Sequence, residues 1–155
     1  MDCEWSASSF EGIRERLNMA ICMEPIGVVH TDSSRVPRHW TLSDVKGTLV
    51  IDEKYREGMK DIEVGQRIVV IFYFHKSPKF IPEMLAQQPP HRDRKLGVFS
   101  ICSPQRPNPV GMSIVDVLDV EENRIHVQGL DMFDGTPILD LKPFVTGKHD
   151  CPSHG

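Results

Sequence analysis

Short apolar segments with alternating polar positions recur along the chain and predict strands. These segments are Ile26–Thr31, Gly47–Ile51, Arg67–Phe74, Gly97–Ile101, Met112–Val120, Arg124–Leu130 and Ile138–Leu141. Val and Ile dominate them, and β-branched side chains suit a pleated, half-buried surface. The pair Glu122-Asn123 marks a tight reversal, so that Met112–Leu130 is a predicted hairpin. Many short antiparallel strands must hide their edges, and the pattern therefore predicts an all-β fold, a single compact β-barrel.

Helical signals are few and short, and they suggest where the barrel begins. Residues 10–20 are predicted to form a short helix, and Glu53–Asp61 a short surface helix. Strand-like texture starts at Met23. We therefore predict an N-terminal extension (1–22), a barrel domain (23–147) and a C-terminal tail (148–155). Ser77–Arg94 contains four prolines and is predicted to be a long loop, either ordered or mobile; such a loop in a compact domain is usually functional or disordered.

Length and cysteine usage narrow the class of protein. The 155 residues suit one domain. The four cysteines form no CxxC pair and are predicted to be reduced thiols of a cytoplasmic protein. No segment approaches the roughly 20 apolar residues of a transmembrane helix, and the N-terminus lacks the apolar core of a signal peptide. His149, Cys151 and His154 lack a fourth ligand and a scaffold, so no metal site is predicted.

Charge is distributed unevenly along the chain. The formal net charge of −4 argues against a bulk polycation that coats nucleic acid. Between His75 and Arg106, however, six Lys and Arg stand against two acidic residues, whereas residues 107–140 hold one Arg against seven acids. Two interpretations are open. The charges form an ordinary solvated surface, or a basic lip meets phosphates beside an acidic pocket.

Three rigid polar turns are the candidate functional segments. They are Val36–His39, the proline-rich Ser103–Gly111, and Leu130–Pro143 around an Asp-Gly turn. Prolines fix the backbone, and those beside Arg106 and Asn108 would hold these side chains in set directions. Each turn alone could be a rigid surface turn; together they favour a binding pocket. The chain has no GxGxxG, GxxxxGK[ST], HExxH or GxSxG motif, so nothing indicates a nucleotide-binding βαβ fold, a zinc protease or an esterase.

At these segments the sequence resembles the TsaA-like (TrmO-type) tRNA adenine-N6 methyltransferases. The resemblance covers roughly residues 24–145. The matching segments are Pro25–Thr31, Val36–Arg38, Phe72–His75, Gly97–Ser100, Arg106–Ser113 (RPNPVGMS), Gly129–Asp131 and Asp134–Phe144 (DGTPILDLKPF). It implies a β-barrel homodimer that binds S-adenosylmethionine and methylates N6 of threonylcarbamoyladenosine at position 37 of tRNA. The chain ends shortly after the last motif and so resembles a single-domain form.

The resemblance also implies site residues. The cofactor contacts would be Pro37, Arg38, His39, His75, Lys76, Cys102, Met112, Asp134, Gly135, Thr136 and Pro137. The acceptor nitrogen is urea-like and a poor nucleophile, so a base would assist, and His75 and Asp134 are the catalytic candidates. The residues expected to meet tRNA are Arg92, Arg94, Lys95, Arg106 and Asn108.

Two positions depart from the family pattern. His39 stands where the family commonly has Gln, and Cys102 where it has Arg. A thiol cannot supply the charged donor fork of Arg. Either a nearby cation substitutes, or affinity for cofactor or tRNA is weaker, or the acceptor differs. A non-catalytic module that binds S-adenosylmethionine or RNA, and a methyltransferase with another acceptor, are therefore the alternative functions.

Overall fold

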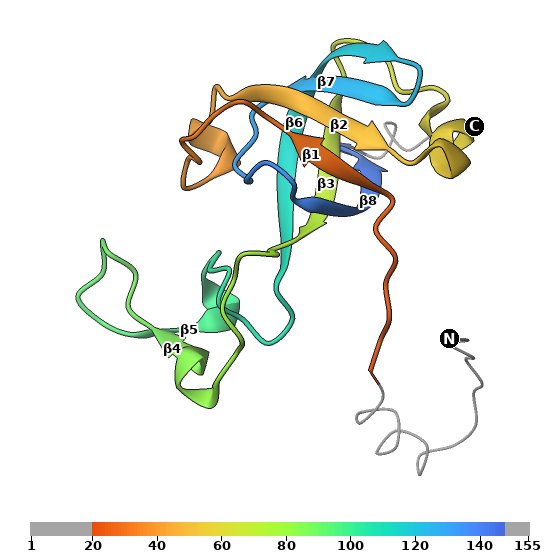
Figure 1. Ribbon diagram of the computed structural model, residues 1–155. Helices are drawn as coiled ribbons and strands as arrows, with labels where there is room; N and C mark the ends of the chain where they lie inside the picture. Colours follow the sequence, from red (N-terminus) through yellow and green to blue (C-terminus); the bar gives the residue numbers. More distant parts are fainter. Residues whose placement is uncertain (1–19, 148–155) are drawn as a thin grey trace.

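The protein folds as a closed six-stranded antiparallel barrel with a protruding arm, as seen in a computed structural model that describes residues 20–147 (Figure 1). The barrel strands are β1 (Gly27–His30), β2 (Lys46–Ile51), β3 (Arg67–Tyr73), β6 (Val110–Glu121), β7 (Arg124–Gln128) and β8 (Pro137–Pro143). Their order is β1-β2-β7-β6-β3-β8, and β8 pairs with β1 to close the barrel. The barrel prediction is thereby confirmed. The predicted helix over residues 10–20 and the tail 148–155 lie essentially outside the described residues.

Strand alternation fills the barrel interior with aliphatic side chains. In β3, Ile68, Val70 and Phe72 are buried while the residues between them face outward. The corresponding inward positions of the other strands include Leu49 and Ile125, both fully buried. Burial of such side chains is the dominant force that stabilises the fold. The buried positions therefore alternate along the predicted strand segments.

Glycine is required where β6 enters the barrel. A Cβ at Gly111 would lie 2.4 Å from the ring of Phe72 and 2.8 Å from that of Phe74. The two rings pack edge-on, with their centroids 5.0 Å apart. Gly111 thus lets the strand pass directly over this aromatic pair, at the end of the barrel from which the arm leaves.

The predicted β6–β7 hairpin is present and is held by its turn. Glu122 has a φ of +51°, and Asn123 donates a side-chain hydrogen bond to the carbonyl of Ile51 at 2.6 Å. Six of the seven predicted strands are present, as the six strands of the barrel. The predicted helix at Glu53–Asp61 is also present, as the 3-10 helix η2 (Glu53–Met59), which buries Met59 against the core.

The seventh predicted strand, Gly97–Ile101, is wrong. Only Leu96–Gly97 is extended, as β5, and Val98–Ser100 forms the 3-10 turn η4. The amide of Ile101 donates to the carbonyl of Val98 at 3.4 Å, and Arg106 donates to the same carbonyl at 3.3 Å. No barrel strand pairs with this segment, so local hydrogen bonds, rather than a sheet ladder, set its conformation.

The segment between β3 and β6 leaves the barrel as an arm, which we define as residues 76–109 (Figure 1). It contains η3 (Pro82–Leu85), a two-stranded sheet of β4 (Ala86–Gln87) and β5, and η4. Figure 1 shows it below the barrel, joined to it by the ends of β3 and β6. The long loop predicted at Ser77–Arg94 is therefore the ordered one of its two alternatives, and it forms part of the arm.

Candidate functional site

A polar corner forms where β1 ends beside the turn that precedes β8. The carboxylate of Asp134 accepts a hydrogen bond from the backbone amide of Thr31 at 3.1 Å, and its Oδ1 lies 3.3 Å from Nδ1 of His30. The Thr31 amide is the main cause that lowers the pKa of Asp134 below its usual range, and His30 adds to it. Asp134 is therefore an ionised, exposed carboxylate at neutral pH.

The backbone of the Phe133–Thr136 turn fixes how Asp134 is presented. Gly135 has a φ of +76°, a conformation that glycine adopts without strain, and its amide donates to Val29 at 2.8 Å. Thr136 is buried, and its carbonyl accepts from the amide of Val29 at 2.9 Å. The turn is thus fastened to Val29 of β1 through both Gly135 and Thr136. This leaves Phe133 and Asp134 projecting outward.

A second carboxylate lies beneath the loop that joins β1 to β2. Asp131 accepts hydrogen bonds from the hydroxyl of Ser113, which is fully buried, and from the backbone amide of Trp40. Burial raises the pKa of Asp131, while these donors and the nearby His39 oppose the rise. Its hydrogen bond from Trp40 ties the barrel to the 3-10 turn η1 (Trp40–Leu42).

The same loop carries the predicted cofactor residues Pro37, Arg38 and His39. His39 caps η1 by accepting from the amide of Thr41 at 3.3 Å. Ser43 donates to the carbonyl of Leu130, so the far side of the loop is also held to the barrel. Arg38 reaches the arm, where its guanidinium lies 2.5 Å from Nε2 of His91. The loop therefore bridges the barrel end and the arm.

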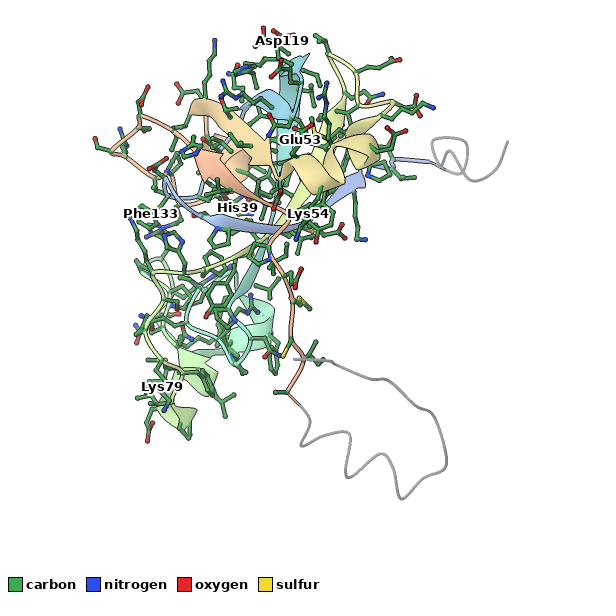
Figure 2. All side chains as sticks on the ribbon, turned by 45° about the vertical axis from the view of Figure 1, so that its right-hand side comes forward. His39, Glu53, Lys54, Lys79, Asp119 and Phe133 are labelled. Carbon is green, nitrogen blue, oxygen red and sulfur yellow. The ribbon has the colours of Figure 1, made fainter. Side chains whose placement is uncertain are left out.

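The start of the arm meets the turn that carries Asp134. The ammonium of Lys76 lies 4.4 Å from the centroid of the Phe133 ring, a cation–π contact. His75 precedes Lys76 directly and is exposed. In Figure 2, Phe133 and His39 lie at the end of the barrel that faces the arm, and Lys79 lies farther out along the arm. Three separate chain segments thus converge on one end of the barrel.

The predicted site residues do not all meet at this end. Among the described residues, no hydrogen bond joins His75 to Asp134. The partners of the Asp134 carboxylate are the His30 ring and the Thr31 amide instead. Met112 is 56% exposed on the outward side of β6. Cys102 is an exposed thiol on the arm. The remaining predicted contacts on the barrel, Gly135, Thr136 and Pro137, belong to the turn already described.

The predicted tRNA contacts divide into exposed and structural groups. Arg92, Arg94 and Lys95 are exposed on the arm. Arg106 is half-buried and donates to the carbonyl of Val98. Asn108 is exposed, and its backbone carbonyl accepts from Val110 at 2.7 Å. The first three cations are therefore available to a partner, whereas Arg106 also holds the arm together.

Sequence reasoning missed three residues of this end: His30, Ser113 and Asp131. His30 lies 104 residues from Asp134, so no local spacing reveals the pair. A polar residue at an inward position of a strand was the available signal for Ser113, since a buried hydroxyl needs a partner. Asp131 directly follows Leu130, which is buried, and the sequence holds no comparable signal for its hydrogen bonds.

The described part of the chain holds neither a cluster of metal-ligating side chains nor a membrane-spanning helix. Within residues 20–147, no group of three His, Cys, Asp or Glu side chains is arranged to hold a metal ion. Over the same residues, no helix has the length and apolar character needed to cross a membrane.

These features define a class of protein: a small antiparallel barrel with a polar site at one end, overhung by a cationic arm. The family described as the tRNA-methyltransferase O N-terminal domain matches residues 26–151, and the chain belongs to this family. The chain is 37% identical over 133 residues to a probable S-adenosyl-L-methionine-binding protein of Pyrococcus abyssi, covering 83% of the chain and 71% of that protein.

Two further comparisons relate the chain to larger proteins. It is 36% identical over 93 residues to the human tRNA (adenine(37)-N6)-methyltransferase. The aligned segment covers 60% of the chain but only 21% of the human protein. The crystal structure of TrmO from Pseudomonas aeruginosa superimposes with a TM-score of 0.67 at 28% identity, covering 82% of the chain and 57% of that structure. The chain therefore corresponds to one part of these two proteins.

Proposed function

We propose that the protein is an S-adenosylmethionine-dependent methyltransferase that methylates N6 of adenosine in tRNA, with threonylcarbamoyladenosine at position 37 as the acceptor. Membership of the tRNA-methyltransferase O family supports the class. The Pyrococcus relative is described as binding S-adenosyl-L-methionine, and the human relative as acting on adenine 37 of tRNA. The acceptor itself is our inference from these relatives.

The observation that carries the proposal is the convergence of three segments on one end of the barrel. The β1–β2 loop reaches the arm through Arg38 and His91. The turn before β8 contacts β1 through Asp134 and the arm through Phe133. A methyl donor and its acceptor must be held together with water excluded, and such a meeting of loops on a rigid barrel suits that task.

The side chains at this end fit the chemistry of the cofactor. S-adenosylmethionine combines an amino-acid group, a sulfonium cation and an adenosine. Arg38 and Lys76 are cations suited to its carboxylate, and the ionised Asp134 is suited to a positive charge. Phe133, 45% exposed, offers an aromatic face. When bound, the cofactor supplies the methyl group. The other predicted contacts, among them Pro37, His39 and Met112, remain predictions.

The lowered pKa of Asp134 separates the two predicted catalytic roles. A general base works best when its pKa lies near the working pH, whereas Asp134 holds its proton only weakly. Asp134 is therefore better suited to balance a positive charge than to accept a proton. His75 keeps its candidacy as the proton acceptor, and His30 joins it because Asp134 lies against its ring.

We also propose that the protein acts as a homodimer in the cytoplasm. Neighbouring outward positions of β3 and β6 are apolar, with Val69 opposite Ile114 and Ile71 opposite Met112. Tyr73 extends this strip and is 43% exposed. A second copy of the chain laid on the strip would remove it from water. Sedimentation velocity on the wild type, and on Ile71→Lys as a disrupting variant, tests this surface.

Labelled cofactor and bulk tRNA test the proposed activity. The protein is incubated with S-adenosylmethionine carrying a labelled methyl group, and the tRNA is then digested to nucleosides. Label in a threonylcarbamoyladenosine derivative supports the proposal, and label in another nucleoside refutes the acceptor while leaving the reaction class. Cofactor binding by calorimetry without any transfer would favour a non-catalytic module, which the Cys102 thiol makes the second candidate.

A further inference from the structure

The arm presents an excess of cations, with six Lys and Arg against the two acids Glu83 and Asp93. Lys79, Arg92, Arg94 and Lys95 are exposed. In the described part of the chain, each ion pair joins two residues that both lie outside the arm. Within that part, these four cations therefore belong to no ion pair. Exposed, unpaired cations grouped on a projection are the footprint of a polyanionic partner.

Phe99 lies on a fixed turn of the same arm. Its neighbour Val98 is 1% exposed and anchors η4, whereas Phe99 is 79% exposed. Arg106 and the amide of Ile101 both donate to the carbonyl of Val98, and these bonds hold the turn. A single exposed phenyl ring is ordinary on a protein surface. A ring held exposed by an anchored turn, on an arm that also exposes several cations, has the form of a stacking platform.

Side-chain hydrogen bonds make the arm rigid before any partner binds. Gln87 donates to the carbonyl of Gln105 at 2.6 Å, and its own carbonyl oxygen accepts from Ser103 at 2.6 Å. Ser77 donates to the carbonyl of Pro104 at 2.8 Å. These bonds join the outgoing and returning halves of the arm. A preorganised surface loses little conformational entropy on binding.

We propose that Phe99 stacks on an unpaired nucleobase of the RNA substrate, while the arm's exposed cations hold the flanking phosphates. Proteins read single-stranded RNA loops largely through aromatic side chains that stack on splayed bases. The arm leaves the barrel at the end where Lys76 meets Phe133, so RNA held on the arm extends toward the proposed methyl-transfer site. The inference rests on the proposed function, and it adds a contact between Phe99 and an unpaired base in a loop of the RNA.

Three substitutions at one position test the stacking. Fluorescence anisotropy measures binding of a stem–loop RNA with an unpaired loop, and of a fully paired duplex of similar length. Phe99→Ala is expected to weaken stem–loop binding about tenfold or more, the size of one base–aromatic stack. Phe99→Leu, which keeps apolar bulk but has no π face, is expected to be as weak. Phe99→Trp keeps wild-type affinity, and duplex binding changes in none of them.

Arg94→Ala is the matched control for the phosphate contacts. It is expected to weaken stem–loop and duplex binding alike and to reduce the salt dependence by about one counterion, whereas Phe99→Ala leaves the salt slope unchanged. Cofactor calorimetry and melting temperature are expected to match the wild type in all Phe99 variants, because the ring is exposed.

Other outcomes separate the inference from the proposed function. The arm also exposes Ile81 and Leu85, each 47%, so a second copy of the chain is the rival partner for this surface. If Phe99→Ala dissociates an oligomer in sedimentation velocity and Phe99→Leu restores it, the ring packs on protein and the stacking proposal is overturned. Equal stem–loop affinity in all variants also overturns it. A wild type that binds no RNA instead refutes the proposed function.

Discussion

Ser113→Ala probes the buried hydrogen bond beneath the β1–β2 loop. The hydroxyl of Ser113 is fully buried and donates to Asp131, which also accepts from the backbone amides of Trp40 and of Asp131 itself. Alanine fits the same space but leaves one carboxylate oxygen without its donor. Hydrogen bonds to charged groups contribute about 1.5–3 kcal/mol, so we expect a loss of about 2 kcal/mol in the free energy of unfolding at neutral pH. For a domain of this size that lowers Tm by about 4–8 °C.

The pH dependence identifies the ionised carboxylate as the partner. Burial raises the native pKa of Asp131 above its ordinary value of 3.8, so its contribution to stability is most favourable below that value. Stability is lost as the pH rises through the native pKa. Removing Ser113 raises the native pKa further and enlarges this loss. The penalty of Ser113→Ala should therefore be full at neutral pH and fall to about 1 kcal/mol, the size of a neutral hydrogen bond, in acid.

Urea unfolding at several pH values measures the effect, and Asp131→Asn is the matched control. Asparagine keeps a carbonyl oxygen for the Ser113 hydroxyl but carries no charge. In that background Ser113→Ala should cost about 1 kcal/mol at every pH. A penalty that is independent of pH and equal in both backgrounds would refute the assigned partnership between the hydroxyl and an ionised carboxylate.

Three further predictions concern the site and the barrel. Asp134→Ala should abolish most methyl transfer to tRNA with little change in the urea midpoint. Asp134→Asn still accepts a hydrogen bond from the Thr31 amide but carries no charge, and it should be nearly as inactive. Gly111→Ala places a Cβ 2.4 Å from the Phe72 ring and should cost about 1–3 kcal/mol by urea unfolding. Gly97→Ala, which meets nothing within 4 Å, should stay within about 0.5 kcal/mol. Arg38→Ala should weaken S-adenosylmethionine binding in calorimetry while Tm is unchanged, because its side chain is exposed.

The strands were predictable because their signal is local. Alternating burial in β3, with Ile68, Val70 and Phe72 inward, follows directly from the alternation of side chains along an extended chain. The Gly97–Ile101 segment has the same apolar texture, yet its backbone bonds close on Val98 within a turn. Strand preference depends on a neighbouring strand to pair with, and the sequence of a segment does not report whether one is present.

The site was predictable in its turns but not in its pairings. The motifs located Arg38 and Asp134, because proline and glycine in the sequence mark positions where the backbone is constrained to a turn. The partner of Asp134 is His30, which lies 104 residues away, and the two meet only because β8 closes the barrel on β1. Closure depends on the register of six strands, which no single segment encodes.

The acidic β6–β7 hairpin, with Asp119, Glu121 and Glu122, lies at the opposite end of the molecule from the cationic arm. Figure 2 shows Asp119 at the end of the barrel remote from the arm and Lys79 far out on the arm. Asp119 lies nine residues beyond Val110, where the arm joins β6. At about 3.3 Å per residue that is roughly 30 Å. The Debye length at physiological salt is about 8 Å, so the acidic end of the barrel is screened from a partner held on the arm. The net charge of −4 therefore does not by itself oppose RNA binding on the arm, because the acidic charge of the β6–β7 hairpin lies beyond the screening length.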